Sequence, residues 1–404
     1  MQDIIQELQD RGYIEQLTHE KEMRDLFQKE SVRFYIGIDP TADSMHIGHF
    51  VALMVAARLQ KAGHKPIILM GGGTATIGDP SGRTDMRKML TREELDHNVE
   101  CIRKQAEKFV SFDGDNAAII VNNADWLLDL KYIDFMREIG TLFSVNRMLS
   151  AECYKTRLES GLTFFEMGYL LLQSYDFLYL HDKYNCKMQI GGNDQWSNII
   201  GGVELIRKVG AEDSYGMTFK LLTTAEGKKM GKTAKGALWL NPDKTSPYEF
   251  YQYWRNIGDT EVNKVLRLLT FLPDEEVERL STLKDEKINE AKKIAAFEIT
   301  RLIHGEEEAK KAEETARGLF EGSGNIENMP TVKVESADIS LVDAIVFTGI
   351  APSKGQARKL IEQGGITLND EKITDINFAL SEKDFKEGYA IIKKGKKVYY
   401  KLEK

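Results

Sequence analysis

The N-terminal half of the chain alternates short apolar runs with longer segments of helical periodicity. Residues 32–38 have the length of a buried strand, whereas residues 49–59 are apolar over a helical length and are followed by Gly63. The same alternation predicts further strands at residues 66–70, 117–121 and 188–190 and further helices at residues 164–180 and 196–209. Strands that alternate with helices indicate a doubly wound, Rossmann-like α/β domain, whose parallel sheet binds ligands at the carboxyl ends of its strands.

The two ends of the chain have other patterns. Residues 1–32 are expected to form an amphipathic helix, because apolar residues recur there at helical spacing. Residues 247–320 are helical in pattern almost throughout. Residues 321–338 begin with a stretch of Gly, Ser, Asn and Pro that has no clear period, and we interpret them as a linker. We therefore expect an α/β domain at residues 1–240, an α-helical domain at residues 247–320, the linker and a small α+β domain at residues 339–404.

The charge of the chain is acidic overall. Its 404 residues include 55 Lys and Arg against 63 Asp and Glu, for a formal net charge of -8. This balance excludes a basic protein that coats nucleic acid, so any RNA contact must use a local basic patch. The C-terminal residues 339–404 reverse the balance with 12 basic and 9 acidic residues. The basic surplus therefore lies in the small C-terminal domain.

The spacing of the cysteines and the length of the apolar runs indicate the cellular compartment of the protein. Three cysteines without CxxC spacing favour neither a disulfide framework nor a zinc site, and they fit a reducing cytosol. The first residues lack a basic segment followed by an apolar run, so no signal peptide is predicted. No run of about 18 apolar residues is present that would span a membrane. We expect a cytoplasmic protein that does not interact with membranes.

The strongest chemical signal is the segment DPTADSMHIGH at residues 39–49, between the first strand and the next helix. His46 and His49 are three residues apart, which places both on one face of the first helical turn, where the helix N-terminus favours anions. Gly48 leaves room for a base or ribose to approach the backbone. The alternatives are an HxxH metal pair and two hydrogen-bonded surface histidines. A metal is disfavoured because no further ligand group lies nearby at a suitable spacing.

A second signal is the segment KKMGKT at residues 228–233, on a loop that follows an expected strand. Lys229 and Lys232 are three residues apart and, together with the hydroxyl of Thr233, can hold the β- and γ-phosphates of a nucleotide. Alone, such a pattern more often marks a solvated lysine loop. The signal becomes strong because it follows the histidine segment at a distance of about 180 residues.

A third signal lies in the helix expected at residues 164–180. Tyr169, Gln173 and Asp176 are separated by four and three residues and therefore share one helical face. A polar face on an apolar helix needs a polar partner, and an amino-acid substrate would supply one. The alternative is a solvated face against which Tyr169 merely packs.

The two phosphate segments resemble the HIGH and KMSKS motifs of class I aminoacyl-tRNA synthetases, and the surrounding sequence is similar to the bacterial tyrosyl-tRNA synthetase family. The resemblance runs from about Tyr35 to the C-terminus and includes GDPSG at residues 78–82 and GGNDQW at residues 191–196. It implies an enzyme that makes tyrosyl-adenylate from tyrosine and Mg-ATP and then esterifies the 3′ end of tRNA(Tyr). ATP with Mg²⁺ would be a substrate, without a bound prosthetic group or a dedicated metal site.

The resemblance also implies a set of tyrosine-binding residues. Those matching Tyr35 and Asp176 bond the tyrosine hydroxyl, and those matching Tyr169 and Gln173 hold the ammonium with the help of Asp79. Two more lie close to the substrate: Asp39 near the amino group and Gln195 near the carboxylate and the ribose.

The same resemblance assigns phosphate chemistry to the two motifs. His46 and His49 would stabilise charge on the departing pyrophosphate from one side, and Lys229, Lys232 and Thr233 from the other. Further ATP contacts would be Gly48, Asp194 at the ribose, and Arg83 and Arg87 at the pyrophosphate.

Beyond the catalytic domain, the resemblance implies contacts with tRNA and with a second subunit. Residues 247–320 would bind the anticodon region. In the C-terminal domain, a basic helix followed by a glycine turn resembles a small RNA-binding fold, in which Lys354, Arg358 and Lys359 would contact phosphates. A solvated basic helix is an equal alternative from the residues alone. Apolar helices at about residues 126–161 would form the interface of a homodimer, and residues 226–236 a mobile lysine loop.

Two residues depart from the family's pattern, and two other functions compete with this interpretation. Gly231 stands where the lysine motif has serine, and Ala52 stands where related enzymes often carry Thr or Pro. A tryptophanyl-type synthetase is one rival, but Tyr35 and Asp176 can both bond a phenol and so favour tyrosine. A synthetase-like RNA chaperone or splicing protein is the other, and the retained histidines and lysines disfavour it.

Overall fold

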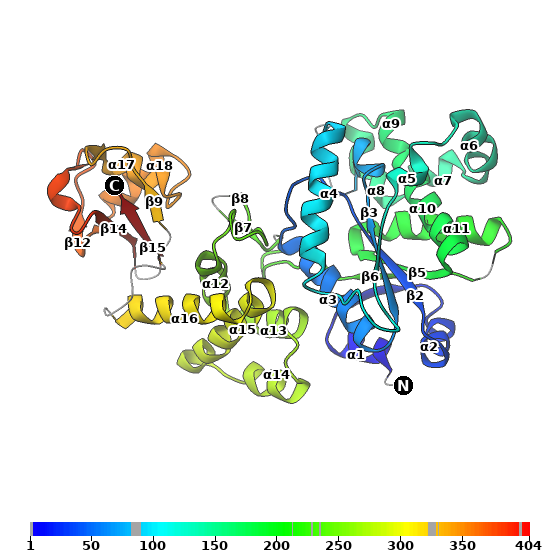
Figure 1. The fold of residues 1–404 in the computed structure, drawn as a ribbon, viewed down its shortest axis with the longest axis horizontal. Coiled ribbons are helices and arrows are strands. Elements are labelled where there is room, and N and C mark those ends of the chain that lie inside the picture. Colours follow the sequence, from blue (N-terminus) through cyan, green and yellow to red (C-terminus); the bar gives the residue numbers. More distant parts are fainter. Residues whose placement is uncertain are drawn as a thin grey trace. The chain divides into compact units, whose positions relative to one another are not determined.

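The computed structural model describes residues 3–81, 90–211, 213–227, 229–233, 236–321, 329, 331–395 and 398–404 (Figure 1). The chain divides into two compact units. The first comprises Met1–Met230 with Arg267–Leu269, and the second Gly231–Leu266 with Thr270–Lys404. Within the described ranges, no helix is both long enough and apolar enough to cross a membrane.

A six-stranded sheet forms the centre of the first unit, with the strand order β1-β6-β5-β2-β3-β4. All neighbouring strands are parallel except β1, which lies antiparallel to β6 at one edge. The expected α/β fold with a parallel sheet is therefore confirmed, with one antiparallel edge strand added. The strands are β1 (Ile14–Leu17), β2 (Arg33–Ile38), β3 (Lys65–Met70), β4 (Ile119–Asn122), β5 (Cys186–Gly192) and β6 (Tyr215–Phe219).

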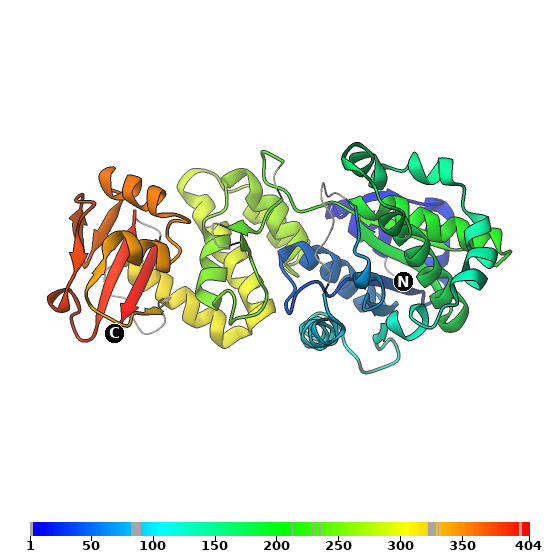
Figure 2. The same cartoon turned by 90° about the horizontal axis from the view of Figure 1, so that it is seen from above.

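Helices cover both faces of this sheet (Figures 1 and 2). Helices α3 and α4 lie on one face, and α10 and α11 lie on the other. Helix α3 is buried from Phe50 to Gln60, because its sequence is apolar nearly all round and cannot present a polar face to water. The bounds are α3 (Ile47–Lys61), α4 (Arg92–Ala106), α10 (Tyr169–Tyr184) and α11 (Trp196–Lys208), with the short 3₁₀ turns η1 (Thr74–Thr76) and η3 (Asn193–Gln195).

Two of the expected helices are divided. Residues 1–32 form α1 (Ile4–Asp10), the strand β1 and α2 (Glu20–Lys29), so the prediction of one helix was wrong. The reason is Gly12, whose φ of +82° does not continue a right-handed helix and lets the chain turn into β1. The helix expected at residues 164–180 consists of α9 (Phe164–Met167) followed by α10.

Short helices fill the chain between β4 and α9, where the alternating pattern is interrupted. Several large apolar side chains remain exposed on them, including Tyr132 and Ile133 at 62% and 65%. The helices are α5 (Ala124–Leu127), α6 (Tyr132–Glu138), α7 (Val145–Leu149) and α8 (Glu152–Ser160), with η2 (Gly140–Leu142).

The part of the second unit before residue 322 is mainly helical. Helix α12 begins with a capping box, in which the Ser246 hydroxyl accepts the Glu249 N–H and the Glu249 carboxylate accepts the Ser246 N–H. The helices are α12 (Pro247–Arg255), α13 (Val262–Leu269), α14 (Asp274–Ser281), α15 (Ile288–His304) and α16 (Glu306–Glu321), of which α13 ends with the three residues Arg267–Leu269 assigned to the first unit.

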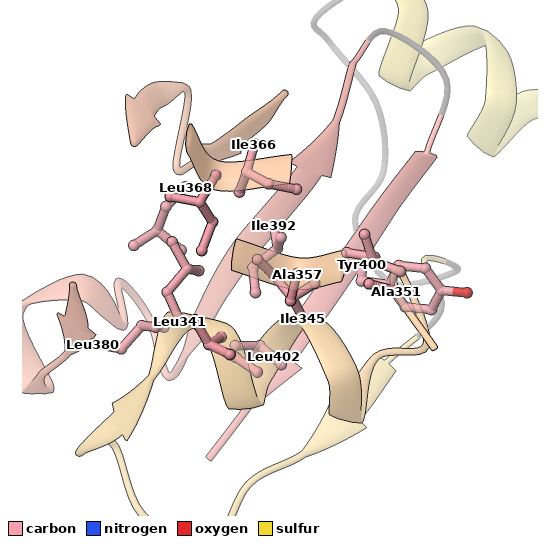
Figure 3. Close-up of a cluster of buried hydrophobic side chains, with 14 of the residues drawn as sticks. Leu341, Ile345, Ala351, Ala357, Ile366, Leu368, Leu380, Ile392, Tyr400 and Leu402 are labelled. Atoms are coloured by element: carbon pink, nitrogen blue, oxygen red, sulfur yellow. The ribbon is translucent and has the colours of Figure 1, made fainter. Parts of the chain in front are cut away.

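The C-terminal part of the second unit is an α+β fold with its own core, shown in Figure 3. Its five-stranded sheet has the order β12-β11-β14-β15-β9, beside the strand pair β10-β13. Strand β9 lies inside the expected linker at 321–338 and pairs in parallel with β15, because Val332 packs against the core. The linker is therefore shorter than predicted. The bounds are β9 (Thr331–Lys333), β10 (Ile339–Ser340), α17 (Leu341–Phe347), α18 (Lys354–Glu362), β11 (Ile366–Leu368), β12 (Glu371–Ile373), β13 (Ala379–Leu380), β14 (Tyr389–Lys394) and β15 (Val398–Glu403).

Candidate active site

The carboxyl ends of β2, β3 and β5 meet at one edge of the sheet, because these strands are parallel neighbours. Asp39 follows β2, Gly71 follows β3, and Asp194 and Gln195 follow β5. Gly37 is the exposed position of β2, so the sheet is open to solvent just before Asp39. A Cβ at Gly71 would lie 2.1 Å from Asp39 Oδ1, so only glycine leaves that carboxylate in place.

A chain of hydrogen bonds crosses this end of the sheet. The Tyr169 hydroxyl donates to Asp39 Oδ2 at 2.9 Å, and the Thr74 hydroxyl donates to Asp39 Oδ1 at 2.8 Å. The Asn123 amide donates to Thr74 Oγ1 at 3.0 Å and to Asp176 Oδ2 at 2.8 Å. These bonds connect Tyr169 to Asp176, so the polar groups of the site hold one another in position.

Asp176 is the most deeply buried acidic group of this chain of bonds, with 1% of its surface exposed. Its oxygens accept hydrogen bonds from the Asn123 amide and from the Trp126 indole, each at 2.8 Å. Burial raises the pKa of Asp176 to about 8, the two hydrogen bonds oppose this rise, and the charge of Asp39 adds to it. Trp126 stacks on Tyr179 with 4.3 Å between ring centroids.

Asp176 was predicted from its helical spacing, whereas Asn123 and Trp126 were not predicted as site residues. Both follow directly after β4, at the same edge of the sheet as the other site residues. A polar residue and a tryptophan just after a strand were the available signal, but their partner lies about 50 residues away on α10.

Tyr35 lies in β2 and is buried, with its ring 5.4 Å from that of Phe177. Its hydroxyl has no hydrogen-bond partner within the described structure. Burial raises the pKa of Tyr35 well above its ordinary value, and the nearby charge of Asp176 raises it further. The structure therefore brings Tyr35 and Asp176 close together without a hydrogen bond between them.

Two glutamine side chains also carry a buried oxygen without a partner in the described residues. Gln173 lies one turn after Tyr169 on α10, as its spacing predicted, and its Oε1 is unpaired. Gln189 was missed by the sequence analysis; it lies on β5 directly across from Tyr35 on β2, and its Oε1 is also unpaired. An unpaired buried polar group costs about 1–3 kcal/mol, which a polar ligand can offset.

Asp79 and Gln195 form a second polar pair of the site. Gln195 Nε2 donates to Asp79 Oδ2 at 2.7 Å, and the Ser81 N–H donates to Asp79 Oδ1 at 2.8 Å. Asn198 on α11 donates to Gln195 Oε1 at 3.1 Å, which fixes the orientation of the Gln195 amide. The fold thus joins two predicted site residues that are 116 positions apart in the sequence.

The two histidines of the first motif share the start of α3. His46 is the N-cap, and its Nδ1 accepts the Gly48 N–H at 3.0 Å, while His49 Nδ1 accepts the His46 N–H at 3.3 Å. Their ring centroids are 4.3 Å apart. Because both Nδ1 atoms accept, the neutral rings carry their protons on Nε2 and can donate from there. A Cβ at Gly48 would lie 2.7 Å from the His46 ring, which explains the glycine between them.

The lysine motif is described only in part. Lys229 Nζ lies 4.0 Å from Asp194 Oδ2. Burial raises the pKa of Asp194, whereas the Lys229 charge lowers it and the Asp79 charge raises it. In the second unit, Lys232 and Thr233 form β7 (Lys232–Thr233), which pairs with β8 (Gly236–Ala237). The predicted contacts that lie outside the described residues are Arg83, Arg87 and the side chains of Lys232 and Thr233.

The candidate RNA-binding residues lie on α18. Lys354, Arg358 and Lys359 are exposed, while Ala357 and Ile361 of the same helix pack into the core. The basic side chains therefore occupy the solvent face of the helix. Lys354 Nζ forms an ion pair with Asp343 Oδ1 on α17 at 2.7 Å.

The chain is similar to known proteins over its whole length. Residues 28–321 match the family described as tRNA synthetases class I (W and Y), and residues 322–402 match the tyrosine–tRNA ligase SYY-like C-terminal domain. Tyrosine–tRNA ligase 1 of Clostridium acetobutylicum is 57% identical over 405 residues, which cover 100% of this chain and 99% of that protein. Tyrosine–tRNA ligase of Acetivibrio thermocellus is 58% identical over 407 residues, which cover 100% of both chains.

Two solved structures share the fold. A C-terminally truncated mitochondrial tyrosyl-tRNA synthetase of Aspergillus nidulans superposes with a TM-score of 0.71 at 28% identity, covering 79% of this chain and 94% of that chain. The tyrosyl-tRNA synthetase of Archaeoglobus fulgidus, complexed with L-tyrosine, superposes with a TM-score of 0.59 at 18% identity, covering 77% of this chain and 100% of that chain.

Proposed function

This chain belongs to the tyrosyl-tRNA synthetase family of class I tRNA synthetases, and on that premise we propose which of its residues act in each step. Its activity is that of a tyrosine–tRNA ligase. It forms tyrosyl-adenylate and pyrophosphate from tyrosine and ATP, and then transfers the tyrosine to the 3′ end of tRNA(Tyr). The observation that carries our assignment of the tyrosine pocket is the buried Asp176 beside the unpaired hydroxyl of Tyr35.

The tyrosine hydroxyl lies between these two groups in our proposal. Each Asp176 oxygen already accepts one hydrogen bond and has a second lone pair that can accept the substrate hydroxyl. The substrate oxygen in turn accepts the Tyr35 proton, which has no partner in the described protein. Phenylalanine offers neither bond and would leave the Tyr35 hydroxyl unpaired and Asp176 without its third hydrogen bond, which supports selection without a proofreading domain. Tyrosyl-tRNA synthetases are themselves the standard example of such selection.

The substrate ammonium has three N–H donors, and three acceptors suit them. Gln173 Oε1 is buried and has no partner in the described residues. The Tyr169 oxygen can accept because its proton is directed at Asp39. The Asp79 carboxylate is the third acceptor, with Asp39 adding negative charge nearby. Gln195, held by Asp79 and Asn198, would then lie at the carboxylate end of the substrate.

In adenylate formation, an oxygen of the tyrosine carboxylate attacks the α-phosphorus of ATP in line. The bond from that phosphorus to the pyrophosphate oxygen breaks, and negative charge passes to the pyrophosphate. The Nε2–H groups of His46 and His49 and the N-terminus of α3 would stabilise this charge on one side. Lys229 and Lys232 would act on the other side. Mg²⁺ would enter with ATP. We also assign phosphate contacts to Thr233, Arg83 and Arg87. Gly48 and Asp194 would contact the nucleoside.

The second unit would hold the tRNA. We assign anticodon binding to the helices between Pro247 and Glu321, and phosphate contacts in the C-terminal fold to the exposed Lys354, Arg358 and Lys359. The +3 balance of residues 339–404 supports this assignment, because phosphate contacts dominate nucleic-acid affinity.

A homodimer is proposed through the helices between β4 and α10. Seven of the nine large apolar side chains that are exposed within the described residues lie on this segment: Leu128, Tyr132, Ile133, Val145, Leu158, Phe164 and Phe165. So much exposed apolar surface on one segment marks an interface, and a second copy could cover it symmetrically. We further propose that the enzyme acts in the cytoplasm, where tRNA and ATP are present.

One experiment tests the tyrosine pocket directly. ATP–pyrophosphate exchange is measured with each of the twenty amino acids for the wild-type protein and for Asp176→Asn. We expect exchange with tyrosine alone in the wild type and a sharp loss in the variant. An Asp176→Asn protein with unchanged rate and KM for tyrosine would contradict the assignment of the pocket.

A further inference from the structure

Phe347 is the most exposed large apolar side chain in the described structure, with 70% of its surface open to solvent. It is the last residue of α17, and the helix buries its other apolar face: Leu341 and Ile345 point into the C-terminal core (Figure 3). A single exposed aromatic residue is common on protein surfaces. The residues around Phe347 therefore determine which kind of ligand this ring can bind.

The neighbours on α17 and α18 are charged. Phe347 and Asp343 are four residues apart on α17, so they lie on the same side of the helix. Lys354 pairs with Asp343 at 2.7 Å and is itself 61% exposed. Arg358 lies four residues after Lys354 on α18 and therefore on the same side of that helix as Lys354. Two cations are thus placed beside the face that carries Phe347.

The turn after Phe347 is held by hydrogen bonds, one of which comes from a third cation. Thr348 is buried, and its hydroxyl donates to the Ile345 carbonyl at 3.0 Å. Lys394 on β14 donates from Nζ to the Ile350 carbonyl at 3.2 Å, three residues after Phe347. Because α17 and this turn are already ordered, a ligand that stacks on Phe347 need not order the backbone that presents it.

We propose that Phe347 stacks on an unpaired base of the bound tRNA while Lys354, Arg358 and Lys394 contact the phosphates on either side. The inference rests on the proposed RNA binding of the C-terminal fold and adds a residue to it that carries no charge. An aromatic ring flanked by cations is the arrangement that binds single-stranded RNA, because bases stack on the ring and phosphates meet the charges. A protein partner would instead need a wider apolar surface than one ring.

The test compares tRNA tyrosylation by the full-length protein and four variants: Phe347→Ala, Phe347→Trp, Arg358→Ala and Val209→Ala. Val209 is also exposed but lies on the first unit, so it controls for loss of an exposed apolar side chain. Each KM for tRNA is measured at several salt concentrations, together with pyrophosphate exchange and the melting temperature. Phe347→Ala should raise the KM for tRNA about fivefold or more, and Phe347→Trp should stay near wild type.

The salt dependence separates stacking from charge. Phe347→Ala should keep the wild-type slope of log KM against log salt, because stacking releases no counterions, whereas Arg358→Ala should reduce the slope by about one. If Arg358→Ala raises the KM but Phe347→Ala leaves it within twofold of wild type, the stacking proposal is wrong and RNA binding stands. If neither variant changes the KM, RNA binding by this face and the stacking proposal both fail.

Discussion

The indole nitrogen of Trp126 donates a hydrogen bond to Asp176 Oδ1 at 2.8 Å, between a short helix after β4 and the long helix α10. The Asn123 amide holds the other oxygen of the same carboxylate. Together they fix the direction in which Asp176 can accept a further hydrogen bond. In our proposal that direction leads to the hydroxyl of the tyrosine substrate, so Trp126 would position the residue that selects the substrate.

Trp126→Phe should therefore weaken tyrosine binding while it retains an aromatic ring against Tyr179. Leaving a buried acceptor without one of its partners costs about 1–3 kcal/mol, so we expect the KM for tyrosine in pyrophosphate exchange to rise about fivefold or more. Trp254→Phe is the matched control, because the indole nitrogen of Trp254 is buried without a partner in the described residues. Equal effects of the two substitutions would show that lost packing, rather than the hydrogen bond, is responsible.

The free energy of unfolding should depend on the ionisation of Asp176. Burial raises its pKa in the folded protein from the ordinary 3.8 to about 8, so between these values the folded state binds more protons than the unfolded state. The free energy of unfolding must then fall as the pH rises from about 4 to about 8. Asp176→Asn removes this contribution, and its loss of stability between pH 5 and pH 8 in urea titrations should be smaller than that of the wild type. Asp115→Asn, at an exposed position, is the control and should lose as much stability between pH 5 and pH 8 as the wild type. If Asp176→Asn also loses as much stability as the wild type, Asp176 is ionised in the folded protein throughout this range.

His46 has two separable functions in our proposal, because it caps α3 and would also contact the phosphates. His46→Ala should lose both, with a fall in melting temperature and a rate of adenylate formation about 100-fold lower in single-turnover experiments. His46→Asn keeps a capping side chain and should retain the melting temperature but not the rate. Tyrosine affinity, measured at equilibrium, should change little in both variants. A large loss of tyrosine affinity with a normal rate would contradict the phosphate role.

Dimer formation should depend on the exposed apolar helices after β4. Ile133 is 65% exposed on α6, and Ile133→Glu would bury a charge at the proposed interface. We expect this variant to sediment as a monomer at micromolar concentration, where the wild type sediments as a dimer. Val209→Glu places the same charge at an exposed apolar position outside that segment and should leave the dimer intact. A wild-type protein that is an active monomer under these conditions would reject the interface.

Truncation after Glu321, where α16 ends, should separate the two steps of the reaction. Both phosphate motifs and the tyrosine pocket precede this point, so pyrophosphate exchange should remain nearly intact. Tyrosylation of tRNA should fall sharply, because the basic C-terminal fold is lost, and the deficit should shrink at low salt, where the remaining cations are less screened. Equal losses in both assays would mean that the C-terminal fold supports the catalytic domain, and full retention in both would mean that it is dispensable for tRNA.

Features that depend on neighbours in the chain could be predicted from the sequence. The period of apolar residues distinguished the α/β, α-helical and α+β regions, and the structure confirms these fold classes. His46 and His49 could be paired from their spacing because both belong to one helical turn. Tyr169, Gln173 and Asp176 could be grouped because they occupy one helix. In these cases the geometry of a single element fixes the distance between the residues.

Features that depend on which distant segments become neighbours could not be predicted, because they arise when the chain folds. Strand β1 was hidden in an amphipathic pattern and β9 in an expected linker, because each is stabilised by a partner strand from a distant part of the chain. Asn123 and Trp126 gain their role from contact with Asp176, about 50 residues away. The raised pKa of Asp176 likewise comes from burial, which no local pattern reports. Burial and long-range contacts are properties of the folded chain, and they convert an ordinary aspartate on a helix into the acceptor at the base of the proposed tyrosine pocket.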